Sequence, residues 1–257
     1  MSSDFILQTK ALTKEFKGFV AVDKVDLSVR RGHIHALIGP NGAGKTTCFN
    51  LLTKFLVPTS GSILFNGIDI TADTPAHIAR RGIVRSFQIS AVFPHLSVLE
   101  NVRVALQRKL GTSFHFWKSE RSLHALDARA LELLAAVDLE DAAGEPTVEL
   151  SYGRKRALEI ATTLAMEPEL MLLDEPTQGM GLEDVDRIRR LIKKVSANRT
   201  VLMVEHNMGV VASIADTITV LQRGAILAEG PYAVVSKNPA VVEAYMGTAS
   251  IEMAGAH

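Results

Sequence analysis

Residues 39–47 combine three glycines with a lysine and two threonines in the order that a phosphate-binding loop requires. They read Gly39, Pro40, Asn41, Gly42, Ala43, Gly44, Lys45, Thr46 and Thr47, a full G-x-x-x-x-G-K-[ST] motif. The glycines allow a tight backbone whose N–H groups point inward at phosphate oxygens. Lys45 can reach the β- and γ-phosphates, and the Thr46 hydroxyl can bind Mg²⁺. By itself the loop indicates a nucleoside triphosphate and nothing more specific.

A second group of candidate residues follows the apolar run at 170–173, which predicts a buried strand. Asp174 stands at the carboxyl end of this strand, where open α/β sheets bind ligands. Its carboxylate can hold Mg²⁺ through water. Glu175 comes next and can act as the general base that polarises an attacking water.

The elements that must position these residues are predicted from the spacing of apolar residues. The run 33–38 suits a strand before the loop, and 46–52 suits a helix whose N-terminus faces the anion. Alternation over 5–38 predicts two or three antiparallel strands, and 61–70 predicts another strand pair around Asn66-Gly67. Helical spacing covers 123–139 and 157–166. Strands and helices then alternate at 170–173, 184–195, 200–204, 208–215 and 217–221. This order predicts an α/β fold with a parallel sheet and an N-terminal antiparallel β layer.

Composition narrows the class of protein. The 257 residues carry 28 Lys+Arg and 28 Asp+Glu, so bulk charge gives no reason to expect a nucleic-acid partner. A single cysteine, Cys48, excludes an internal disulfide and fits a reducing compartment. We find neither a signal peptide nor an apolar stretch of the roughly 18 residues that a spanning helix needs. We therefore expect a soluble chain, or one attached to a membrane only through a partner.

A short motif between the loop and the acidic strand points to a family. Ser151, Tyr152, Gly153 and Arg154 follow Leu150 and open a helix, which Ser151 caps while Gly153 allows a ligand to approach the backbone. Here the chain resembles the ABC (ATP-binding cassette) ATPases, whose Leu-Ser-Gly-Gly-Gln signature lies before the acidic strand. Tyr152 replaces the first glycine of that signature, and Arg154 replaces the glutamine.

Other family motifs have matches in the expected order. Gln88 matches the glutamine that senses Mg²⁺ and the attacking water, and His206 matches the switch histidine that contacts the γ-phosphate. Phe16 matches the aromatic residue on which adenine stacks, with Phe19 as its rival. One departure is Gly181, which stands where many relatives carry an aspartate. It puts communication between subunits through that loop in doubt.

Two further segments resemble the ATPase subunits of branched-chain amino acid importers. One is the Tyr-Gly signature followed by residues 156–161, and the other is the closing segment 238–247. Residues 103–147 are also similar to the long helical segment of the larger ATPase of that family. The closing segment can alternatively be a packing helix, and the ATPase of lipopolysaccharide export has a similar ending with a standard signature.

The resemblance implies a complete set of expectations. The chain is one ABC ATPase domain, with a core at 1–89 and 156–257 and a helical subdomain at about 90–155. It uses ATP and Mg²⁺, with Glu175, His206 and Gln88 in catalysis and Thr46, Gln88 and Asp174 at the metal. Ser151–Arg154 faces the ATP of a second ABC ATPase subunit, identical or paralogous. Two integral-membrane permease subunits bind the groove around 88–100, on the cytoplasmic face of the membrane, and an importer adds a substrate-binding protein.

Alternative functions remain at this point. They are the ATPase of a lipid or lipopolysaccharide exporter, a soluble ABC ATPase of DNA repair or translation, and an inactive regulatory subunit. The chain has neither a long coiled coil nor two cassettes, and it retains Glu175 and Lys45. The sequence does not name the cargo. His33 and His35 are interpreted as structural. The cluster at 114–117, with the one tryptophan, suits a membrane partner or subdomain packing equally.

Overall fold

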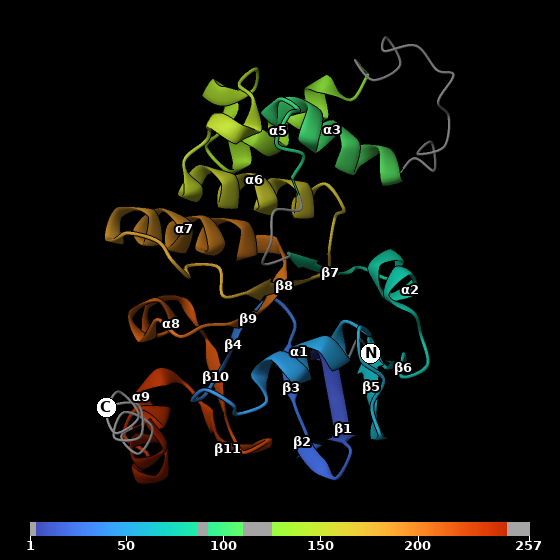
Figure 1. Cartoon of the computed structure of the whole chain (residues 1–257), viewed down its shortest axis with the longest axis vertical. Coiled ribbons are helices and arrows are strands. Elements are labelled where there is room, and N and C mark those ends of the chain that lie inside the picture. The colour runs from blue at the N-terminus through green and yellow to red at the C-terminus, as the bar shows by residue number, and fades with distance from the viewer. Residues whose placement is uncertain (1–3, 87–91, 110–124, 246–257) are drawn as a thin grey trace.

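Two sheets form the framework of the computed structural model, which describes residues 4–86, 92–109 and 125–245 (Figure 1). The larger sheet has the order β11-β10-β4-β9-β8-β7, in which β11 is antiparallel to β10 and the other neighbours are parallel. Its strands are β4 (Ile34–Ile38), β7 (Ile83–Ser86), β8 (Leu170–Asp174), β9 (Thr200–Val204), β10 (Thr217–Gln222) and β11 (Ala225–Gly230). The predicted parallel sheet is confirmed, and every residue of β4, β8 and β9 is buried.

The smaller sheet is the predicted antiparallel layer. It consists of β1 (Phe5–Phe16), β2 (Phe19–Val25), β3 (Ser28–Arg30), β5 (Ser60–Phe65) and β6 (Ile68–Asp69). The turn between β5 and β6 is formed by Asn66 and Gly67, whose φ values of 51° and 77° match the tight hairpin turn that this dipeptide favours.

Helices cover the larger sheet and extend beyond it. They are α1 (Lys45–Leu52), α2 (Pro75–Arg80), α3 (Val98–Lys109), α5 (Asp127–Ala136), α6 (Tyr152–Leu164), α7 (Leu182–Val195), α8 (Met208–Ile214) and α9 (Tyr232–Val235). Figure 1 shows α3, α5 and α6 grouped at one end of the molecule, with α7 between α6 and the strands. No helix in the described ranges has the length and apolar character needed to cross a membrane.

Several predicted helix boundaries are wrong, most clearly those of two helices. The helix expected over 123–139 ends at Ala136, because Asp138 adopts a left-handed backbone with φ 57° that cannot continue a right-handed helix. Its expected first residues, 123 and 124, lie outside the described ranges. The helix expected at 157–166 begins at Tyr152 and ends at Leu164. A boundary of the helical subdomain at 155 would therefore fall inside α6.

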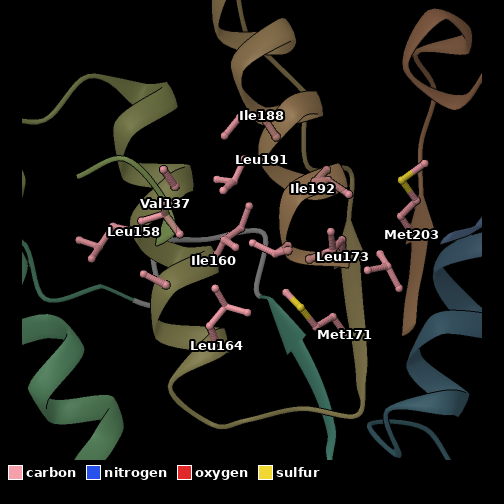
Figure 2. Packing of buried hydrophobic residues seen from close by; sticks show 14 of the residues in the cluster. Val137, Leu158, Ile160, Leu164, Met171, Leu173, Ile188, Leu191, Ile192 and Met203 are labelled. Atoms are coloured by element: carbon pink, nitrogen blue, oxygen red, sulfur yellow. The ribbon is translucent and has the colours of Figure 1, made fainter. Parts of the chain in front are cut away.

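A buried apolar layer fixes α6 and α7 to the sheet. Ile160 and Leu164 of α6 point toward Met171 and Leu173 of β8 (Figure 2). On the same face of the sheet α7 contributes Ile188, Leu191 and Ile192 to this cluster. Since burying one such side chain contributes about 1.5–3 kcal/mol, this layer anchors α6 firmly to the strand that ends in Asp174.

Candidate functional site

The loop between β4 and α1 has the tight backbone that its glycines predict. Gly39, Gly42 and Gly44 have φ values of 150°, 76° and 99°, which L side chains rarely adopt. A Cβ on Gly39 would lie 2.2 Å from the carbonyl oxygen of Leu221, and one on Gly44 would lie 2.4 Å from that of Ala21. The loop is therefore wedged between neighbouring strands, and glycine is required at both positions.

Lys45 opens α1 and folds back over the loop. Its Nζ donates to the carbonyl oxygens of Gly39 (2.7 Å) and Pro40 (3.0 Å). Burial lowers the pKa of Lys45, and the nearby Glu175 carboxylate opposes this shift. Thr46 is exposed and Thr47 half-buried at the N-terminal end of the helix. The loop lysine and the acidic residue after β8 are thus neighbours in space.

Asp174 ends β8 with a buried side chain whose charge is balanced by an arginine. Its carboxylate contacts the guanidinium of Arg85 on β7, which also donates to Asn50 Oδ1 of α1 (2.7 Å). The side chain of Asp174 is only 3% exposed, so an unpaired charge there would be costly. Arg85 was not among the predicted residues. The only sequence signal for Arg85 was its positive charge directly after the apolar residues 83 and 84.

Glu175 and His206 meet across the ends of β8 and β9. His206 Nε2 contacts Glu175 Oε1, and the Glu175 N–H donates to the carbonyl oxygen of Val204 (2.9 Å). Glu175 has a φ of 46°, a strained value for a residue with a side chain. Its side chain is 12% exposed and that of His206 is 42% exposed, so the pair is open to solvent from the histidine side.

A buried glutamate that we did not predict, Glu205, braces the two loops that carry this pair. Its Oε1 accepts from the N–H (3.0 Å) and hydroxyl (2.6 Å) of Thr177. Its Oε2 accepts from the N–H groups of His206 (2.9 Å) and Asn207 (3.0 Å). Its place beside His206 in the sequence was the available signal.

The signature residues open α6 as expected. Ser151 caps the helix, and its Oγ accepts from the Arg154 N–H (3.4 Å). Tyr152 is 55% exposed. A Cβ on Gly153 would lie 2.3 Å from Oδ1 of Asp184 in α7, so a larger residue there would have to displace the Asp184 carboxylate. The Arg154 guanidinium pairs with Asp141, which ties α6 to the turn after α5. Figure 1 shows α6 with α3 and α5, apart from α1.

Other predicted residues are less constrained. Phe16 and Phe19 face each other across the β1–β2 hairpin, 41% and 66% exposed, and Lys14 Nζ lies 5.1 Å from the Phe16 ring centre. Gln88 and the 114–117 cluster lie outside the described residues. His35 is buried against Thr219, and no group of three or more His, Cys, Asp or Glu suited to a metal ion occurs in the described part of the chain.

Two family models match the chain. The model described as "ABC transporter" matches residues 22–178, more than half of the sequence. The chain belongs to the ABC transporter family. The model described as "Branched-chain amino acid ATP-binding cassette transporter" matches residues 225–250 of this ABC protein.

Relatives and solved structures of ABC proteins agree over nearly the whole chain. The high-affinity branched-chain amino acid transport ATP-binding protein BraF of Pseudomonas aeruginosa is 41% identical, over 95% of this chain and 98% of its own. LivG of Escherichia coli, of the same description, is 38% identical over 95% and 98%. The ADP conformation of an ATP-binding cassette of an ABC transporter matches with a TM-score of 0.83 and 31% identity, over 95% of this chain and 100% of that one. A nucleotide-free cassette matches with a TM-score of 0.82 and 30% identity, over 94% and 98%. The predicted ABC ATPase fold is confirmed, and the chain is a nucleotide-binding transport ATPase.

Proposed function

We propose that this chain is the ATPase that powers uptake of branched-chain amino acids, or of a closely related small polar solute. The observation that carries the proposal is the 41% identity to BraF across almost the full length of both chains. The match of residues 225–250 to the branched-chain family supports it independently of the phosphate loop and the signature, which all ABC ATPases share in some form.

In this proposal the loop 39–47 binds the triphosphate. Its backbone N–H groups hold phosphate oxygens, and Lys45 exchanges its present contacts with the Gly39 and Pro40 carbonyls for the β- and γ-phosphates. Phe16 stacks on adenine. Thr46 and Asp174 offer the hydroxyl and carboxylate oxygens that Mg²⁺ prefers, with Gln88 as a further expected contact. When bound, the ion neutralises charge on the phosphates.

Glu175 acts as the general base. Its carboxylate lies beside Lys45 and contacts His206, which orients it to accept a proton from the attacking water. His206 keeps the carboxylate in place and contacts the γ-phosphate. The brace provided by Glu205 holds both loops in this arrangement.

Other subunits complete the transporter. A second ABC ATPase subunit faces this one, so that Ser151–Arg154 at the positive end of α6 meets the ATP bound by the partner. Two permease subunits bind the groove around 88–100, beside the helical part that we delimit at about 90–155. A substrate-binding protein delivers the cargo, and the chain works at the cytoplasmic face of the membrane.

Uptake measurements test this proposal. Cells in which the gene is deleted are complemented with the wild-type chain or with Glu175→Gln, at matched expression. Uptake of labelled leucine, isoleucine and valine is compared with that of urea and phenylalanine. We expect branched-chain uptake to return with the wild type alone. If all uptake is unchanged while an envelope lipid accumulates in the inner membrane, the chain instead drives export.

A further inference from the structure

Helix α6 carries a buried arginine that donates hydrogen bonds to backbone carbonyls at the end of β8 and in the loop after it. Arg156 is 5% exposed and lies five residues after the cap at Ser151. Its Nη2 donates to the carbonyl oxygens of Asp174 (2.8 Å) and Glu175 (3.0 Å), and its Nε donates to that of Pro176 (3.2 Å). One guanidinium therefore holds three successive peptide groups around the proposed catalytic carboxylate.

The charge of this arginine is balanced within the same helix. Arg156 Nη1 donates to Oε2 of Glu159 (2.6 Å), whose side chain is only 9% exposed. A buried ion pair contributes little net stability, since desolvation offsets most of the attraction. What the arginine provides instead is a rigid planar fork of donors, which an apolar residue or a lysine cannot reproduce.

The peptide of Glu175 needs such support. A φ of 46° is strained for glutamate and persists only where the surroundings fix it. Its N–H donates to Val204 O (2.9 Å) and its carbonyl oxygen accepts from the Gln178 N–H (3.1 Å) as well as from Arg156. Of these three contacts, the one from Arg156 comes from a helix outside the loops at the ends of β8 and β9.

That helix begins with the signature. The rise of 1.5 Å per residue puts Arg156 only about 7–8 Å along the axis from Ser151. Figure 2 shows α6 packed onto β8 through Ile160 and Leu164, C-terminal to Arg156. Any displacement of the signature end that pivots about this anchored part would change the carbonyl contacts of Arg156. Gly181, which stands where many relatives carry an aspartate, offers no carboxylate for communication between subunits through its own loop.

We propose that Arg156 is a positioning residue that couples the signature end of α6 to the Glu175 loop. Nucleotide held by the partner against Ser151 shifts α6, and Arg156 converts this shift into the hydrolytic geometry of Glu175. The inference rests on the proposed pairing of two ATPase subunits, in which the signature faces the ATP of the partner.

The test uses the transporter purified with its partner subunits and three variants of this chain. Arg156→Gln/Glu159→Gln removes both charges together and so avoids leaving one unpaired. Glu159→Gln is the control for losing the counter-charge alone: its amide oxygen can still accept from Arg156, and thermal melting measures the cost of leaving the buried arginine charge unpaired. Arg156→Lys retains the charge without the fork. For each, thermal melting, affinity for a fluorescent ATP analogue, kcat and KM for phosphate release, and the Hill coefficient are measured.

We expect the double variant to lose about tenfold to a hundredfold in kcat, the range typical of a misplaced catalytic group. Its nucleotide affinity and KM should stay within about threefold of wild type, and its Hill coefficient should fall toward one. Glu159→Gln should melt at a lower temperature but keep the kcat of the wild type, because Arg156 retains its bonds to the loop carbonyls. Arg156→Lys should have a kcat between those of the wild type and the double variant. A kcat of the double variant within twofold of wild type overturns the proposal. So does a parallel loss of affinity and kcat, which would mark a merely structural role.

Two further results are also informative: misfolding of the double variant, and the turnover of Ser151→Arg. If the double variant does not fold, Arg156→Lys decides: reduced kcat at unchanged affinity supports the proposal, and unchanged kcat overturns it. The variant Ser151→Arg distinguishes a failure of the proposed subunit arrangement from a failure of the role of Arg156 alone. If Ser151→Arg leaves turnover unchanged, the signature does not face a partner's ATP, and the proposed arrangement fails together with this inference. If Ser151→Arg abolishes turnover while Arg156 can be replaced freely, only this inference fails.

Discussion

The strand before the phosphate loop carries a buried, neutral histidine that should make the protein sensitive to acid. His35 on β4 is 1% exposed, and its Nε2 lies 2.7 Å from Oγ1 of Thr219. Thr219 donates its hydroxyl hydrogen to Oε2 of Glu229 (2.6 Å), so its oxygen can accept from His35 Nε2–H. Burial, with a smaller contribution from nearby His33, lowers the pKa of His35 from 6.5 to about 4.

The sign and size of the effect follow from proton linkage. In the unfolded chain His35 binds a proton as the pH falls below 6.5, whereas in the folded chain it resists protonation until about 4. Its contribution to the free energy of unfolding is therefore complete above pH 6.5 and is lost as the pH falls from there toward 4. Between about pH 7.5 and pH 5, His35 alone should lower the free energy of unfolding by about 2 kcal/mol.

Urea unfolding at several pH values measures this loss. Since the other histidines also titrate in this range, the matched variant is His35→Gln, whose amide can still donate to Thr219 but does not titrate. We expect the wild type to lose about 2 kcal/mol more than the variant between about pH 7.5 and pH 5. Equal losses in the two proteins would refute the assignment of this acid sensitivity to His35.

Three further predictions follow from the site and its surroundings. Gly44→Ala should weaken ATP binding at least about tenfold more than Gly42→Ala. A Cβ at 44 clashes with a strand, whereas a Cβ at 42 lies in open space and adds only backbone strain of about 1–2 kcal/mol. Equal affinities of the two variants in a calorimetric titration would contradict this. Phe16→Ala should cost about 1–3 kcal/mol of ATP affinity, and a larger cost for Phe19→Ala would show that the rival ring stacks on adenine. Burial raises the pKa of Cys48 to about 12, so the native thiol should resist a disulfide reagent near pH 8 and react only after denaturation; prompt labelling of the native chain would be inconsistent with its burial.

Much of the fold was predictable because its signals are local. The phosphate loop needs glycines where its backbone has positive φ, and the buried strands β4, β8 and β9 are continuous apolar runs. Asn66-Gly67 predicted a tight turn because few other dipeptides adopt that backbone. The helix over 123–139 was overestimated, since the apolar spacing continues through Val137 and Leu139 beyond the left-handed Asp138.

The residues that hold the site together were harder to predict. Arg85, Arg156 and Glu205 are charged residues whose burial depends on partners that are distant in the sequence, such as Asp174 for Arg85 and Thr177 for Glu205. A sequence shows that a charge interrupts an apolar segment, but not which groups will satisfy it. For Arg156 the local hint was the i, i+3 spacing from Glu159 on the same helix.

The most direct test of the account is ATP binding and hydrolysis by Glu175→Gln in the assembled transporter. Phosphate release and equilibrium binding of ATP are measured on the same preparations at equal Mg²⁺, with Lys45→Ala as the contrasting variant. If Glu175 is the base, the glutamine variant should lose about 10²–10⁴-fold in turnover and still bind ATP, whereas Lys45→Ala should lose binding itself. Near-wild-type hydrolysis by Glu175→Gln would contradict the account.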